Sequence, residues 1–165
     1  MILAVILGGC ATMQSIIKST FPYTATLIIP AGAKAGSPAS ATSAASSFDE
    51  IFGNQNGTNY IKEVRIASAK LDASSPANKS LGMFKSVKLY ISNGDSGEIL
   101  VASRSDVQQN IGSNLVLDID NSKFLDDYIR GNSLKIRLEY ILRNANTTDV
   151  SIRTALSFTS APNPQ

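Results

Sequence analysis

The sequence predicts an all-β protein: a single antiparallel β-sandwich, immunoglobulin-like in architecture, with about seven strands and one or two short helical turns. Three observations lead to this fold class. Residues 133–144 and 149–160 alternate apolar and polar side chains with the period of two that half-buried strands show. Turn-forming residues recur at fairly regular spacing, and no long stretch has a helical period. A closed barrel is the second fold compatible with this pattern.

The first predicted strand is Tyr23–Pro30, which prolines bound at positions 22 and 30. Proline cannot donate to a strand ladder, so we expect an edge strand. The low-complexity segment 31–47 follows, and its small side chains gain little from burial, which predicts a surface loop or crossover. Residues Phe48–Phe52 can form one helical turn with Ser47 as its cap.

The middle of the chain predicts three further strands. Asn59–Leu71 is predicted to be a strand, and its apolar side chains face one side throughout only if a bulge lies near Ala67–Ser68. Residues 72–82 are polar and are predicted to be a loop. Phe84–Ser92 is the next strand, and the turn signal at 93–97 leads into a returning strand. That return is expected to place Ile99 opposite Ile91 and Val101 opposite Leu89.

The segment 114–130 predicts a strand and then a short helix. Leu115, Leu117 and Ile119 alternate as in one strand. In Asn121–Arg130 we expect a helix, capped by Asn121 or Ser122 and ended by Gly131. Its residues Phe124, Leu125 and Tyr128 are expected to pack on one end of the core.

The two long C-terminal strands are expected to form a hairpin. The side chains expected to face inward are Leu134, Ile136, Leu138, Tyr140 and Leu142 in the first strand, and Val150, Ile152, Thr154, Leu156 and Phe158 in the second. A register pairing Leu142 with Val150 also sets Glu139 opposite Arg153 and Arg143 opposite Asp149. Opposite charges across a ladder contribute roughly 0.2–1 kcal/mol each, so both patterns favour this register.

Composition fits one domain and excludes several kinds of site. The chain has 165 residues, 43% of them hydrophobic, which is enough for one buried core. Its 15 basic and 13 acidic side chains are interspersed, which argues against a basic face for nucleic acid. Histidine is absent, so the commonest general base and metal ligand is missing. The single cysteine excludes an intramolecular disulfide and a Cys-rich zinc site.

The N-terminal segment combines a short apolar run with that cysteine. Residues 2–7 are far too few to span a bilayer, which needs about 20. They end in Leu7-Gly8-Gly9-Cys10, which resembles the lipobox of bacterial lipoproteins. The resemblance implies a signal peptide at 1–9, lipid attachment at Cys10, a tether over 10–22 and a sandwich domain from 23 to 165.

The segment also departs from that pattern. The apolar run is short and no Lys or Arg precedes it, whereas secretory signals have a basic start and a longer apolar stretch. A true start upstream of Met1 is one explanation. The alternative to a lipobox is a buried N-terminal strand with an incidental cysteine.

No sequence motif indicates catalysis or a bound cofactor. Asp118 and Asp120 share a strand face and are weak calcium candidates, but the spacing of a calcium-binding loop is missing, so we expect no metal. Without histidine to activate a serine, and without a Gly-x-Ser-x-Gly elbow, we expect no enzyme. The three Asn-x-Ser/Thr sequons, at Asn56, Asn78 and Asn146, are better explained as turns.

The runs IKEVRIASAKLDA, FKSVKLYISNGDSGEILVASRSDV, IGSNLVLDIDNSKFLDDYI and SLKIRLEYILR resemble small lipoproteins of Bacteroidetes that join a lipobox to a β-sandwich of unassigned function. The resemblance implies a cell envelope location, at the outer membrane, and a membrane partner through the lipid. A non-enzymatic structural or binding role is the first expectation. The alternatives are a fimbrial subunit that exchanges the 23–30 strand and a glycan-binding module using Tyr60 and Tyr90.

Overall fold

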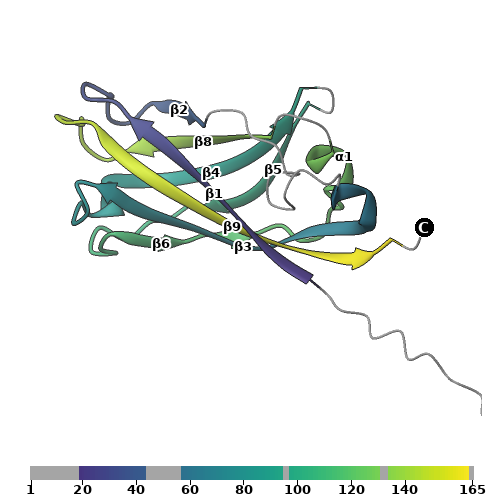
Figure 1. The fold of residues 1–165 in the computed structure, drawn as a ribbon. Helices are drawn as coiled ribbons and strands as arrows, with labels where there is room; N and C mark the ends of the chain where they lie inside the picture. The colour runs from purple at the N-terminus through teal and green to yellow at the C-terminus, as the bar shows by residue number, and fades with distance from the viewer. Residues whose placement is uncertain (1–18, 44–56, 95–96, 131–133, 164–165) are drawn as a thin grey trace, which may run out of the picture.

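The computed structural model describes residues 19–43, 57–94, 97–130 and 134–163, which form a β-sandwich of two antiparallel sheets (Figure 1). The lipobox residues Leu7–Cys10 and the predicted turn at Phe48–Phe52 lie outside these ranges. In spatial order, sheet A contains β1 (Ser19–Ile29), β9 (Val150–Pro162), β3 (Ile61–Ser75) and β6 (Asn114–Val116). Sheet B contains β2 (Pro38–Thr42), β8 (Lys135–Leu142), β4 (Phe84–Asn93), β5 (Gly97–Arg104) and β7 (Asp118–Ile119). The sandwich prediction is confirmed, with nine strands in the described residues where about seven were expected.

The core lies between the inner faces of the sheets, and strand parity places its residues correctly. Every residue predicted to face inward in β8 and β9 is at most 2% exposed, from Leu134 to Leu142 and from Val150 to Phe158. Phe21 of β1 and Phe158 of β9 stack with ring centroids 5.8 Å apart. Tyr140 meets Phe84 edge-on at 5.7 Å. Burial raises the pKa of the Tyr140 hydroxyl, because the charged form loses its solvation.

The predicted C-terminal hairpin is wrong, because β8 and β9 belong to different sheets. In sheet B, β8 lies between β2 and β4, whereas β9 lies between β1 and β3 in sheet A. Glu139 therefore faces Lys88 of β4, and Arg153 faces Asp72 of β3. Residues 143–149 cross between the layers instead of forming a turn within one sheet. Alternation shows which side chains of a strand are buried. It does not show which strands pair, because two strands that face each other across the core have the same alternation as two neighbours within one sheet.

Two other predictions of connectivity are corrected in the same way. The expected loop 31–47 contains β2, an edge strand that buries Ala41 against the core. The expected strand through Leu115, Leu117 and Ile119 divides between the sheets: β6 pairs with β3, and β7 pairs with β5. Strands β2, β6 and β7 are short edge strands, so they contain too few residues to show a clear alternation of apolar and polar side chains.

Several local predictions are confirmed, with adjusted ends. The first strand is an edge strand, and it begins at Ser19 rather than at residue 23. The register of β3 against β9 shifts between Ile66 and Ser68, where the bulge was expected. Strand β3 also continues to Ser75, into the expected 72–82 loop. In the β4–β5 pair Ile99 faces Ile91, but a bulge moves Ala102 rather than Val101 opposite Leu89.

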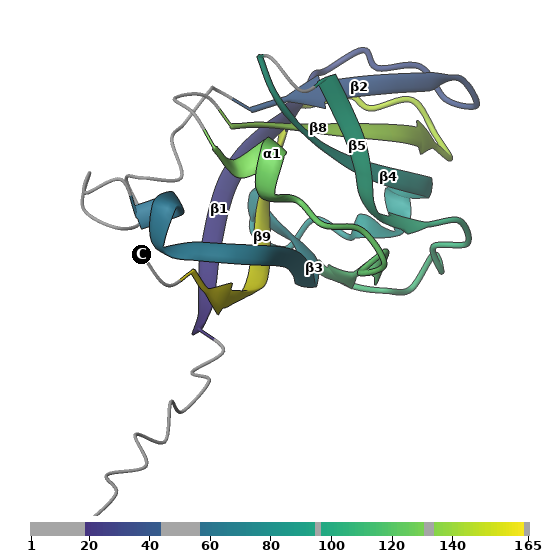
Figure 2. The same cartoon turned by 90° about the vertical axis from the view of Figure 1, so that its right-hand side faces the viewer.

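A second bulge in β3 anchors the short helix α1 (Asp126–Ile129), which lies between β3 and the strands of sheet B (Figure 2). Glu63 has a φ of 56°, and the register shifts between Lys62 and Arg65. The N–H of Val64 donates to the Asp126 carboxylate at 3.1 Å, and its carbonyl accepts from the N–H of Leu125 at 2.8 Å. At this bulge, the N–H and the carbonyl of Val64 therefore form hydrogen bonds with the helix segment instead of with a neighbouring strand.

The helix is shorter than predicted and packs differently. Its N-cap residue is Leu125, which has no side-chain cap, rather than Asn121 or Ser122. Leu125 and Ile129 are buried as one end of the core, but Phe124 is 52% exposed. Instead, the guanidinium carbon of Arg65 lies 3.9 Å from the Phe124 ring centroid. Two 3-10 turns, Gly57–Tyr60 and Leu81–Met83, precede β3 and β4.

Candidate functional site

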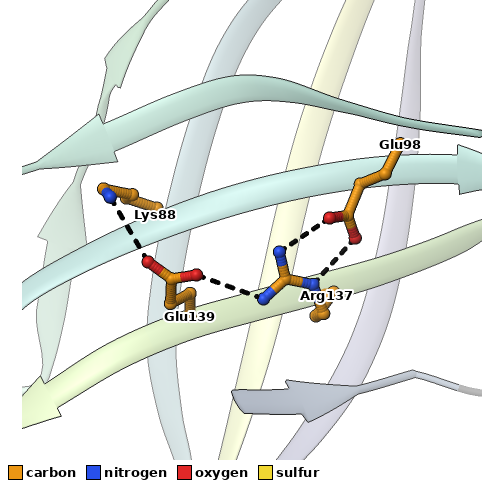
Figure 3. Close-up of polar contacts among 4 residues, drawn as sticks. All are labelled: Lys88, Glu98, Arg137 and Glu139. Atoms are coloured by element: carbon orange, nitrogen blue, oxygen red, sulfur yellow. Dashed lines mark hydrogen bonds and ion pairs between the residues drawn. The ribbon is translucent and has the colours of Figure 1, made fainter. Parts of the chain in front are cut away.

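The outer face of sheet B carries a connected network of charged side chains, with Arg137 of β8 at its centre (Figure 3). The Nε and Nη2 atoms of Arg137 each donate to a different carboxylate oxygen of Glu98, both at 2.7 Å. Its Nη1 contacts Glu139 at 3.4 Å, and Glu139 accepts from Lys88 Nζ at 3.3 Å. The Arg137 guanidinium carbon also lies 4.2 Å from the ring centroid of Tyr90.

The arrangement favours the charged forms of Glu98 and Arg137. The hydrogen bonds from Arg137 lower the pKa of Glu98, and the Glu98 carboxylate raises the pKa of Arg137. A carboxylate with a lowered pKa is a weak base, and this one already accepts two hydrogen bonds. The network is therefore suited to bracing β5, β4 and β8 against one another rather than to proton transfer.

The two weak calcium candidates lie near each other in the chain but bind different cationic side chains. Asp118 pairs with Arg104 at 3.2 Å. Asp120 accepts from the hydroxyl and the N–H of Ser122, at 2.5 and 3.2 Å, and pairs with Lys123 at 3.3 Å. These contacts, those from Ser122 first, lower the pKa of Asp120. Within the part of the chain that the structure describes, no group of three or more His, Cys, Asp or Glu side chains could hold a metal ion.

The predicted aromatic and sequon residues have separate surroundings. Tyr60 is 59% exposed, whereas Tyr90 is half-buried beneath Arg137, so the two do not form one platform. Asn146 is only 5% exposed, and its amide donates to the carbonyls of Pro30 and Thr148, at 3.3 and 2.6 Å. It ties the end of β1 to the β8–β9 connection, which is the turn role expected of it. Asn78 is exposed, and Asn56 lies outside the described residues.

The lipobox residues Leu7, Gly8, Gly9 and Cys10 are not among the described residues, so their role stays a prediction. Within the described ranges, no helix is long and apolar enough to cross a membrane.

Comparison with known proteins assigns no family to this chain. No protein-family model matches the sequence. No curated protein matches it either. Among solved structures, one titled turnip yellow mosaic virus aligns over 100% of this chain and 89% of its own, at 12% identity and a TM-score of 0.31. A similarity at that level carries no argument about what this chain does.

The sequence did not indicate the pairing of Arg137 with Glu98. Parity correctly assigned Arg137, Glu139 and Lys88 to an outer face, but the expected hairpin gave Glu139 the wrong partner. Glu98 is brought beside Arg137 by the turn between β4 and β5 and by the β4–β8 ladder. The sequence predicted the turn at 93–97, which places β5 beside β4. It did not predict that β8 pairs with the other side of β4.

Proposed function

We propose that this protein is a lipid-anchored protein of the cell envelope whose β-sandwich has a non-enzymatic structural or binding role. The observation that carries the proposal is the Leu7-Gly8-Gly9-Cys10 tetrad, which lies shortly before the first strand of a β-sandwich. The intervening residues 11–18 form a short connection between a lipid-bearing Cys10 and Ser19. The resemblance to small Bacteroidetes lipoproteins supports the outer membrane as the site of attachment.

Lipid attachment is enough to hold such a domain at a membrane. Each acyl CH₂ buried in a bilayer contributes about 0.8 kcal/mol, and stable anchoring takes two chains or one chain with a second signal. With basic and acidic side chains nearly balanced at 15 and 13, the chain offers little general attraction to anionic lipid. The anchor therefore depends on Cys10.

The test is metabolic labelling with an alkyne-bearing palmitate analogue, with the gene expressed from its native leader in a bacterium that processes lipoproteins. We expect the wild-type protein to take up the label and to sediment with membranes. Cys10→Ala should lose the label and move to the soluble fraction. Leu7→Asp, which leaves the cysteine in place but destroys the tetrad, should also lose the label. An unlabelled wild-type protein would refute the anchor.

The second candidate is a surface-assembly subunit that polymerises by exchanging strands. The observation that favours it is β1, an edge strand of eleven residues without a charged side chain. Natural edge strands are usually protected by charges, bulges or a short length, and only Pro22 interrupts this one. Along its whole length β1 pairs with β9 of its own domain, so exchange requires that ladder to open. A purified domain that stays monomeric at high concentration, with β1 protected from amide exchange, would count against strand exchange.

A further inference from the structure

A depression of about 470 Å³ lies at the end of sheet B where β8 finishes, and basic and amide side chains line it. Lys85, Gln109, Arg143 and Asn144 supply its polar groups, and Gly36 contributes backbone. The depression is broadly open to solvent, so a ligand bound there stays partly exposed. The network around Arg137 lies elsewhere on the sheet and shares no residue with it.

Backbone hydrogen bonds from separate segments hold this depression together. The N–H of Gly36 donates to the Leu142 carbonyl at 3.0 Å, and the N–H of Arg143 donates to the Met83 carbonyl at 2.8 Å. The loop that carries Gln109 packs so closely on Gly82 that a Cβ there would lie 2.0 Å from the Gln109 carbonyl oxygen. The walls are therefore positioned by the fold before any ligand arrives, which lowers the cost of binding.

The two cations in this depression have no carboxylate partner in the described residues, unlike Lys88, Arg104 and Arg137 elsewhere on sheet B. Arg143 Nη2 donates to the Val107 carbonyl, and Nε is buried without a hydrogen-bond partner. Lys85 makes no ion pair within those ranges, and no acidic side chain lines the depression. The depression therefore has a positive charge that the described residues leave uncompensated.

We propose that this depression binds a small polar ligand that carries one carboxylate, of the class of acidic sugars. Arg143 and Lys85 match a single carboxylate through charge-assisted hydrogen bonds. The amides of Gln109 and Asn144 both donate and accept, as sugar hydroxyls require. A phosphate, which carries up to two charges and only one or two hydroxyl donors, matches the paired donors and acceptors of the amides less well than a polyhydroxylated ring does.

The location suits a binding role at the membrane surface. Figure 1 shows β1 running toward the end of the sandwich where β8 finishes, so β1 begins at the opposite end. On the proposed anchoring through Cys10, the depression faces away from the membrane. This orientation rests on the proposed function, whereas ligand binding by the depression does not.

The test is an NMR titration of the ¹⁵N-labelled full chain carrying Cys10→Ala, so that lipid plays no part. Glucuronate is the probe, glucose the uncharged control and inorganic phosphate the competing anion. We expect saturable shifts of the Gly36 and Asn144 amides and of the Arg143 Nε–H signal with glucuronate. Raising the salt to about 0.3 M should weaken binding, because screening reduces the attraction between charges.

Matched variants connect the binding to this depression. Lys85→Met and Arg143→Met should each weaken glucuronate binding about tenfold, the effect of losing one charge-assisted hydrogen bond. Lys135→Met removes an exposed cation at the other end of β8 and should bind like the parent protein. Lys85 has no hydrogen bond or ion pair of its side chain to lose within the described residues, so its variant tests the site even if Arg143→Met fails to fold.

Four results would overturn the proposal: no saturable shift with glucuronate, equal shifts with glucose, phosphate binding in place of glucuronate, or an equal loss in Lys135→Met. Because the titration omits the lipid, these results leave the anchoring by Cys10 unaffected. Conversely, an unlabelled Cys10 would refute the proposed orientation, with the depression facing away from the membrane, but not the ligand binding.

Discussion

At the scale of single residues, Arg137 and Leu138 show how strand parity separates two environments. Leu138 is fully buried between the sheets, whereas Arg137 lies on the outer face with its side chain 25% exposed. Strand alternation predicts that Arg137 faces outward, and in the structure it contacts Glu98, Glu139 and Tyr90 there. Its removal therefore costs more than an ordinary surface substitution does.

We expect Leu138→Ala to lower the free energy of unfolding by about 2–5 kcal/mol, because it removes buried methyl groups and leaves a cavity. Arg137→Ala should cost about 1 kcal/mol, from two partly exposed ion pairs and one cation–π contact. Lys135→Ala, on the same face, should stay within about 0.5 kcal/mol. Urea denaturation of the three variants measures these values. Equal losses in Leu138→Ala and Lys135→Ala would contradict the assigned faces.

The Glu98–Arg137 pair also predicts how stability depends on pH. The pKa of Glu98 is lowered in the folded protein, so its stabilising effect is present above the unfolded pKa and is lost as the pH falls through the folded value. Glu98→Gln should therefore cost about 0.5 kcal/mol at pH 7, since the pair is partly exposed, and progressively less as the pH falls below the unfolded pKa. Unfolding curves of both proteins across that range give the difference. A difference that grows toward low pH would have the wrong sign.

At the scale of elements, the sequence predicts strands better than it predicts their neighbours. Alternation located β4, β8 and β9 and their buried residues, and a break in alternation located the bulge at Ala67. Pairing depends on residues distant in the chain, and the charges on β8 and β9 fitted a false register as well as they fit the true one. Short edge strands such as β2 lack enough residues to show a period.

A pair of double-mutant cycles tests the corrected pairing directly. Glu139 and Lys88 face each other across the β4–β8 ladder with an ion pair of 3.3 Å, so we expect a coupling energy of about 0.2–1 kcal/mol. Glu139 and Arg153 lie in different sheets, so their cycle should give no coupling within error. Each cycle compares the two single Ala variants with the double variant by chemical denaturation. Coupling in the second cycle alone would restore the hairpin and refute the two-sheet assignment of β8 and β9.

At the scale of the whole molecule, the candidate binding site could not be predicted from the sequence. Arg143 was assigned to the outer face opposite Asp149, but it lines the depression, while Asp149 accepts from the N–H of Ala31 at 2.7 Å. The depression forms only where the loop before β2, the start of β4 and the loop after β5 meet the end of β8. None of these segments carries a motif of its own, so only the assembled fold brings Lys85 and Arg143 together.

The outer edge of β1 in sheet A separates a monomeric anchored domain from a subunit that accepts a second strand at this edge. In the described residues β1 pairs on one side, with β9. Alternate N–H groups of an antiparallel strand point to opposite sides, so we expect alternate amides of β1 to exchange slowly and those between them to exchange fast. Hydrogen exchange followed by NMR on the full-length Cys10→Ala protein, at low and high concentration, measures this pattern. The central strand β9 is the internal control, because both of its edges are paired and all its amides should be protected. Protection of every β1 amide at high concentration would show a second strand bound to this edge and would favour assembly by strand addition over a solitary anchored domain.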